Sequence, residues 1–187
     1  METIYHPKPT TADYFTYQDK QNYWKIKMEI DKLNFLKGVW KGRGIAQYPT
    51  IQTVDYMEEL VFKKDDYFQL FFYEQKTWIK DEEGKFNKSI FWESGFIIDR
   101  GEYLELCYVQ KSGRMEILIG KLNNLPNDNK VEIYFRNKNI FNDERMIRSG
   151  RKFIISESEI KYELHMSTSK NPNYDIHLNA SLMKVSE

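Results

Sequence analysis

The chain offers three imidazole side chains, His6, His165 and His177, and imidazole is the most common metal-binding side chain in proteins. His6 lies in an N-terminal stretch that has no strand-like pattern. His165 alternates with Leu164 and Met166, so it points outward if those two point inward. His177 therefore remains as the candidate ligand. A lone histidine that opens a strand is more often a surface residue, and its position alone leaves both interpretations open.

Other catalytic or metal-binding groups are sparse. Cys107 is the single cysteine, which excludes an intrachain disulfide and a metal cluster built on cysteine. A chain without disulfides also favours a reducing compartment. No nucleophile and base stand at a recognisable spacing, which disfavours a hydrolase.

The charge balance limits the partners that we expect. Lys and Arg together number 28, as do Asp and Glu, so the formal net charge is zero. A neutral chain has no overall electrostatic attraction to nucleic acid or to an anionic membrane surface. The first residues resemble no signal peptide, and no run is long enough to cross a bilayer. We expect a soluble cytoplasmic protein, monomer or homodimer, without nucleic-acid or membrane partners.

From Leu36 onward the hydrophobic pattern has the period of two that is typical of β-strands. Aromatic residues make up 16% of the chain, and such side chains suit half-buried strand faces. A first strand from Leu36 is followed by nine predicted strands, at residues 54–62, 67–78, 86–98, 103–109, 115–120, 131–135, 145–155, 160–167 and 175–185. The pattern predicts an all-β protein with about ten antiparallel strands.

Consecutive antiparallel strands form either a sandwich or an up-and-down barrel. Short hairpin connections favour a closed or nearly closed barrel of the calycin kind, because closure removes exposed strand edges. A barrel somewhat larger than eight strands has room for a small ligand. We predict one such domain over residues 34–187. Residues 1–33 are polar and aromatic, and we predict an N-terminal arm that is partly helical between Asp19 and Leu33.

The first strand carries unusually small residues. Gly42, Gly44 and Ala46 share one strand face with Gly38 and Trp40. Small residues on an inner barrel face allow a ligand or another backbone to approach closely. Glycine also serves where a strand coils sharply at a barrel corner. Glu93, in an aromatic strand, similarly allows two interpretations, a buried carboxylate that holds an arginine or a solvent-facing side chain.

Together these segments resemble the nitrobindin family of heme-binding β-barrels, which are structurally related to fatty-acid-binding proteins. The similar order and spacing hold over residues 34–186. The matching motifs are Leu36-x-Gly38-x-Trp40-x-Gly42-x-Gly44, Tyr48-Pro49-Thr50-Ile51, Tyr56-x-Glu58-Glu59 with Phe62, Gln75-x-Thr77-Trp78, Glu93-Ser94-Gly95-Phe96, Tyr162-x-Leu164-x-Met166, and His177-Leu178-x-Ala180-x-Leu182-x-Lys184-Val185.

The resemblance implies a function as well as a fold. In this family the histidine that opens the last strand is the axial ligand of heme iron, and by position it is His177. The resemblance implies one ferric heme b per chain, reaction with nitric oxide, and isomerisation of peroxynitrite to nitrate, with no catalytic group beyond the iron. We expect the heme to contact Trp40, Gly42, Gly44, Tyr48, Pro49, Thr50, Ile51, Leu164, Met166 and His177.

Several residues depart from the family pattern. Val39 replaces a usual Thr, Ile45-Ala46 interrupts a run of small residues, and Phe91 stands where many relatives have His. Ile97-Ile98 replaces a common Trp-Arg pair. We expect these changes near the mouth of the barrel, where they would remove polar contacts to heme.

Strand parity sets a condition on the ligand role of His177. It shares parity with Asn179 and Ser181, whereas Leu178 and Ala180 look like the inward face. A regular strand would therefore aim His177 outward, and the ligand role requires a bulge beside it. Its second ring nitrogen is expected to donate to a backbone carbonyl or to a carboxylate, for which Asp175 is a candidate.

Two other functions remain open. One is a heme-free carrier of a fatty acid or another apolar small molecule, which the same type of barrel supports. The other is a scaffold whose aromatic N-terminal arm binds a protein. A Soret absorbance band after mixing with hemin would separate the heme protein from the carrier.

Overall fold

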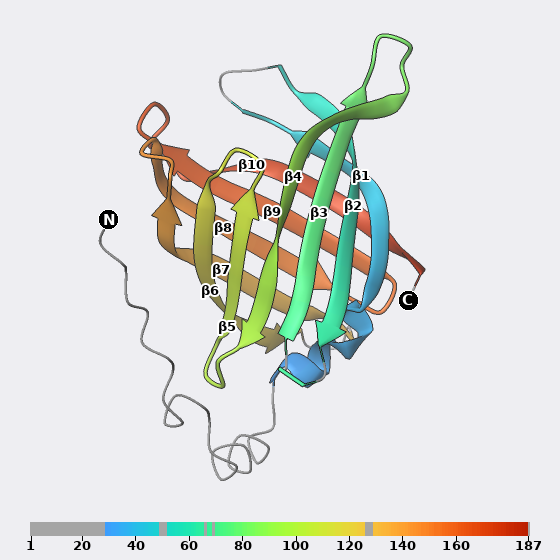
Figure 1. The fold of residues 1–187 in the computed structure, drawn as a ribbon, viewed down its shortest axis with the longest axis vertical. Helices are drawn as coiled ribbons and strands as arrows, with labels where there is room; N and C mark the ends of the chain where they lie inside the picture. The colour runs from blue at the N-terminus through green and yellow to red at the C-terminus, as the bar shows by residue number, and fades with distance from the viewer. Residues whose placement is uncertain (1–28, 49–51, 66, 69, 126–128, 187) are drawn as a thin grey trace, which may run out of the picture.

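Ten antiparallel strands close into one barrel in a computed structural model that describes residues 29–48, 52–65, 67–68, 70–125 and 129–186 (Figure 1). Each strand pairs with its neighbours in sequence, and the first and last strands pair to close the ring. The strands are β1 (Gly38–Ala46), β2 (Val54–Asp65), β3 (Leu70–Lys80), β4 (Phe86–Asp99), β5 (Leu104–Gln110), β6 (Met115–Asn124), β7 (Val131–Phe141), β8 (Met146–Ile155), β9 (Glu159–Thr168) and β10 (Asp175–Ser186). The predicted all-β up-and-down barrel is confirmed.

Inward and outward side chains alternate along the strands, as the period of two requires. On β3, for example, Phe71, Tyr73, Gln75 and Thr77 are buried, and the residues between them are only partly covered. The clearest difference from the prediction is β7, which continues to Phe141. Its polar second half looks like a loop in the sequence, but it pairs with β6 across a bulge. Among the described residues, no helix has the length and apolar character of a membrane span.

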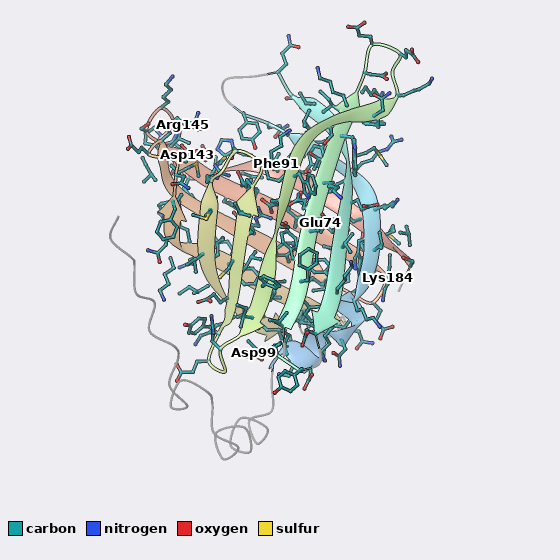
Figure 2. The ribbon with its side chains drawn as sticks, in the orientation of Figure 1. Glu74, Phe91, Asp99, Asp143, Arg145 and Lys184 are labelled. Carbon is teal, nitrogen blue, oxygen red and sulfur yellow. The ribbon has the colours of Figure 1, made fainter. Side chains whose placement is uncertain are left out.

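The 3-10 helix η2 (Glu29–Leu36) closes one end of the barrel (Figure 1). Its apolar residues Ile30, Leu33 and Leu36 are completely or almost completely buried. Asp99, which lies beside η2 in Figure 2, accepts a hydrogen bond from the Ile30 amide at 2.9 Å. The helix therefore acts as a plug. It spans the predicted boundary between arm and barrel, and the rest of the predicted arm, residues 1–28, lies outside the described residues.

The half of the barrel next to η2 is a packed apolar core. A gap of about 10 Å³ remains there, which is room for one water at most. It is lined by Leu36, Phe62, Tyr73, Ile97, Leu106, Ile133, Phe135, Phe153 and Ile155. This half of the barrel therefore has no room for a ligand as large as a porphyrin, and we call the opposite end of the barrel the far end.

Candidate functional site

His177 is buried at the start of β10, at the far end of the barrel, with 4% of its surface exposed. The register between β10 and β9 shifts here. Ile176 pairs with His165 and Leu178 pairs with Leu164, which leaves His177 as the extra residue of a β-bulge. The structure thus contains the irregularity that an inward-facing His177 requires.

The two ring nitrogens of His177 both face backbone carbonyl oxygens. Nδ1 lies 3.2 Å from the oxygen of Gln47, and Nε2 lies 3.2 Å from the oxygen of Met166. A neutral imidazole has one N–H and one lone pair, so only one of these contacts can be a hydrogen bond. The other nitrogen is left with a lone pair and no donor. Asp175, the carboxylate considered from the sequence, is exposed, and backbone carbonyls take its place.

Apolar and aromatic side chains surround the imidazole. Leu164 and Met166 point inward beside it from β9 and are buried. The ring of Tyr48 stacks on the ring of His177, with centroids 5.2 Å apart and an interplanar angle of 18°. Burial raises the pKa of Tyr48, and the nearby Arg114 opposes that shift. The structure thus brings Tyr48, Leu164, Met166 and His177 together.

Pro49, Thr50 and Ile51, which were also expected to line the ligand site, lie outside the described residues. They continue the chain directly from Tyr48. The described part of the site therefore consists of side chains from β9 and β10 and of the segment that follows β1. Among all the residues that the structure describes, no three His, Cys, Asp or Glu side chains form a group that could hold a bare metal ion.

Trp40, which was expected at the ligand, lies at the other end of the barrel. Trp40 is fully buried next to η2, where its indole N–H donates to the carbonyl of Leu36 at 2.8 Å. It stands about 20 Å along β1 from Ala46, which marks the far end. Trp40 is therefore separated from His177 by most of the length of the barrel. The pattern defined its face correctly but not its depth in the barrel.

The space beside the two glycines of β1 is filled by the protein itself. A Cβ atom at Gly44 would overlap the phenol of Tyr56, and one at Gly42 would overlap the backbone of Ser181 on β10. These glycines therefore admit a neighbouring side chain and strand, and they do not form open space for a ligand. Of the interpretations offered for these glycines, the structure supports close approach of the protein's own atoms.

The departures from the family pattern divide between the two ends of the barrel, with Ile45 and Ala46 at the far end of β1. Val39 lies at the η2 end of β1, and Ile97 is buried in the packed core next to η2. The expectation that they alter the mouth is wrong. Phe91 lies toward the far end (Figure 2) and pairs with Thr77 across the ladder. It is the one apolar replacement of these three that can affect a ligand there.

A buried ion pair crosses the middle of the barrel beneath the His177 site. Arg151 on β8 lies 2.5 Å from a carboxylate oxygen of Glu93 on β4, and both are almost completely buried. The same guanidinium donates to the hydroxyl of Tyr73 at 2.6 Å and lies 4.4 Å from the ring centre of Tyr108. Glu93 is thus the buried carboxylate that holds an arginine.

A second buried carboxyl group stands across the barrel interior. The hydroxyl of Tyr162 donates to Glu58 at 2.5 Å, and the amide of Gln75 donates to the Tyr162 oxygen at 2.9 Å. Burial raises the pKa of Glu58 to about 8, although the hydrogen bond from Tyr162 and the charge of Arg151 oppose this. This shift favours the protonated form of Glu58. The two buried carboxyl groups and their partners form a polar layer between the apolar core and the His177 site.

A hollow formed by the described residues lies outside the barrel. It has a volume of about 660 Å³ and is formed by outward-facing side chains such as Arg43, Ile45 and Lys161, with Phe86 at its edge. His177 is not part of it. Its position on the outer surface separates it from the buried imidazole.

Comparison with known proteins agrees with this architecture. Residues 29–184 match the model of the THAP4-like, heme-binding beta-barrel domain. A protein of Arabidopsis thaliana named peroxynitrite isomerase Rv2717c is 30% identical over 157 residues, covering 83% of this chain and 89% of that protein. A peroxynitrite isomerase of Nocardia farcinica is 25% identical and covers 98% of this chain and 99% of its own length.

A ferric nitrobindin-like protein of Streptomyces griseus is 31% identical over 50% of each chain. The crystal structure of Rv2717c from M. tuberculosis superposes with a TM-score of 0.73 at 27% identity, covering 83% of this chain and 96% of that one. The fold, the length and order of the match, and the named relatives agree. The chain therefore belongs to the nitrobindin family, the THAP4-like heme-binding β-barrel domains.

Proposed function

We propose that this protein binds one ferric heme b at the far end of its barrel, with His177 as the axial ligand, and isomerises peroxynitrite to nitrate. The observation that supports this most strongly is the buried imidazole of His177, which has one ring nitrogen that the protein cannot satisfy. The names of the relatives support the reaction.

The residues around His177 suit an axial heme ligand. A ligating imidazole offers one lone pair to iron and donates its other N–H to a carbonyl or carboxylate, which fixes its orientation. His177 has carbonyl oxygens on both sides, so whichever nitrogen binds iron, the other can keep a hydrogen bond. Leu164 and Met166 provide the apolar surface that a porphyrin ring requires.

The chain's own residues would hold the heme, orient its ligand and shield it from water. When bound, ferric heme would supply a Lewis-acid iron for nitric oxide or peroxynitrite. His177 would hold the heme, and the carbonyl of Gln47 or Met166 would fix the tautomer of its imidazole. Leu164 and Met166 exclude water from one side. Isomerisation moves no net proton, so no side chain has to act as an acid or base.

The interior offers little to a fatty-acid carrier. Such a carrier needs a positive charge for the carboxylate of its ligand. Arg151 in the barrel interior is already paired with Glu93 at 2.5 Å, and Arg114 is paired with Glu116 at 3.0 Å. A fatty-acid carboxylate would have to break a buried ion pair, which is strongly unfavourable. We therefore favour heme over the carrier.

Titration with hemin tests this proposal. We expect wild-type protein to develop a Soret band with one equivalent of hemin and to raise the yield of nitrate from peroxynitrite. His177→Ala should lose both, because no other described imidazole lies at the site. His6→Ala is the matched control, since His6 precedes all the barrel strands in the sequence. Identical titrations of wild type and His177→Ala, or saturation by a fatty-acid probe without a Soret band, would refute the proposal.

A further inference from the structure

Tyr174, the residue that directly precedes β10, folds back against the outside of the barrel. Its hydroxyl lies 3.2 Å from the hydroxyl of Tyr134 on β7, and its ring stacks on His165 of β9 with centroids 5.6 Å apart. The guanidinium of Arg148 on β8 lies 4.6 Å from the centre of the same ring. Three adjacent strands thus form a cradle for one side chain.

A glycine makes the cradle deep enough. Gly150 on β8 pairs with His165 on β9 and with Arg136 on β7. A Cβ atom at Gly150 would overlap the hydroxyl of Tyr174. Gly150 is buried although its neighbours Ser149 and Arg151 occupy the inward face, because Tyr174 covers it from outside. We call this contact between Tyr174, Gly150, Tyr134 and His165 the Tyr174 clasp.

The clasp and the inward position of His177 require the same strand register. With the bulge, Ile176 pairs with His165, and Leu178 pairs with Leu164. A regular ladder without the bulge would pair His177 itself with His165 and place its imidazole outside the barrel. That register would also move Tyr174 by one residue, or about 3.3 Å, and take its hydroxyl away from Gly150.

We propose that Tyr174 is a positioning residue for His177, which holds β10 in the bulged register and thereby keeps the imidazole inside the barrel. Only Asp175 and Ile176 separate the clasp from the bulge. The contacts of the clasp therefore stabilise the bulged register of β10 relative to the regular register. The inference deepens the proposed function, because it names what keeps the proposed heme ligand in place, but the register itself can be measured without heme.

The test compares the chemical accessibility of His177 in ligand-free variants. Diethyl pyrocarbonate modifies exposed imidazoles, and peptide mass spectrometry assigns the modified histidine. We expect the rate at His177 to rise about tenfold in Tyr174→Ala and in Gly150→Ala, since tenfold corresponds to about 1.4 kcal/mol in the register equilibrium. Tyr103→Ala is the matched control, because Tyr103 also directly precedes a strand but lies in the turn before β5. In Tyr103→Ala, the modification rate of His177 should stay at the wild-type value.

Rescue separates positioning from general destabilisation. In the double variant Gly150→Ala with Tyr174→Phe, the overlapping hydroxyl is gone, and we expect the protection of His177 to return at least in part. Unchanged protection of His177 in both single variants would overturn the inference, as would equal exposure in the Tyr103→Ala control. Should wild-type protein fail to bind hemin while the clasp variants still expose His177, the proposed function would fail and the inference would stand.

Discussion

The ion pair between Arg151 and Glu93 provides the sharpest test of the fold's energetics. Both side chains are almost completely buried, and their closest atoms, Nη1 and Oε1, are 2.5 Å apart. Arg151→Met removes the positive charge at similar length and leaves Glu93 without a counter-ion in the barrel interior. Breaking one half of a buried pair typically costs about 3–5 kcal/mol. That is a large part of a typical domain stability of roughly 5–15 kcal/mol.

The double variant Arg151→Met with Glu93→Gln should recover much of this loss. Removing both charges leaves no uncompensated ion, and Gln can still hydrogen-bond to Tyr73, whose hydroxyl lies 2.5 Å from the carboxylate. Urea unfolding followed by circular dichroism measures both variants, with the slope m as the check on two-state behaviour. A loss below about 1 kcal/mol in Arg151→Met, or a double variant no more stable than the single, would refute the reasoning.

Three further predictions concern the barrel interior. The raised pKa of Glu58, from 4.5 to about 8, means that the folded state keeps a proton which the unfolded state loses. The contribution of Glu58 to stability should therefore be complete below about pH 4.5 and be lost as the pH rises to about 8, by roughly 1.4 kcal/mol per pKa unit, and Glu58→Gln should remove this part of the profile. Gly44→Ala should cost about 1–3 kcal/mol in urea unfolding because its Cβ overlaps the phenol of Tyr56 and the carbonyl oxygen of Asn179, and less in a Tyr56→Leu background, where only the Asn179 overlap remains. Trp40→Ala should cost about 3–5 kcal/mol yet leave the hemin Soret maximum unchanged, because Trp40 lies next to η2; a shifted maximum would contradict this placement.

The strands could be predicted because their information is local. Alternating residues fix which side chains share a face, and hairpin-length connections fix the order of pairing. The same parity identified the one condition that His177 had to meet, and the bulge beside it is present. The general fold thus follows from the sequence pattern, whereas the bulge was a condition set by the ligand role of His177 and is seen only in the structure.

Depth along the barrel axis could not be predicted in the same way. Trp40 and Ile97 were expected near the ligand, yet both lie at the η2 end. Two residues can share the inner face and still be separated by the length of a strand. Which end a motif occupies depends on where the plug helix packs, and that is set by contacts such as Ile30 with Asp99, far apart in sequence.

Arg151 and Tyr174 were not singled out because their roles depend on distant strands. Arg151 lies in a stretch of mixed polar and apolar residues, and only barrel closure brings it to Glu93. Tyr174 looks like an ordinary loop residue until Gly150 is seen beneath its hydroxyl. Inward parity with Phe153 and Ile155 could have identified Arg151 as a buried charge that requires a partner.

The central claim is that His177 binds the heme iron, and its most direct test is whether free imidazole restores hemin binding to a variant that lacks this side chain. His177→Gly removes the imidazole that is proposed to bind iron and leaves space for a free imidazole molecule. We predict that His177→Gly binds hemin weakly, and that added imidazole restores both the wild-type Soret spectrum and the nitrate yield from peroxynitrite. A wild-type spectrum without imidazole, or no recovery at saturating imidazole, would contradict the assignment of His177 as the heme ligand.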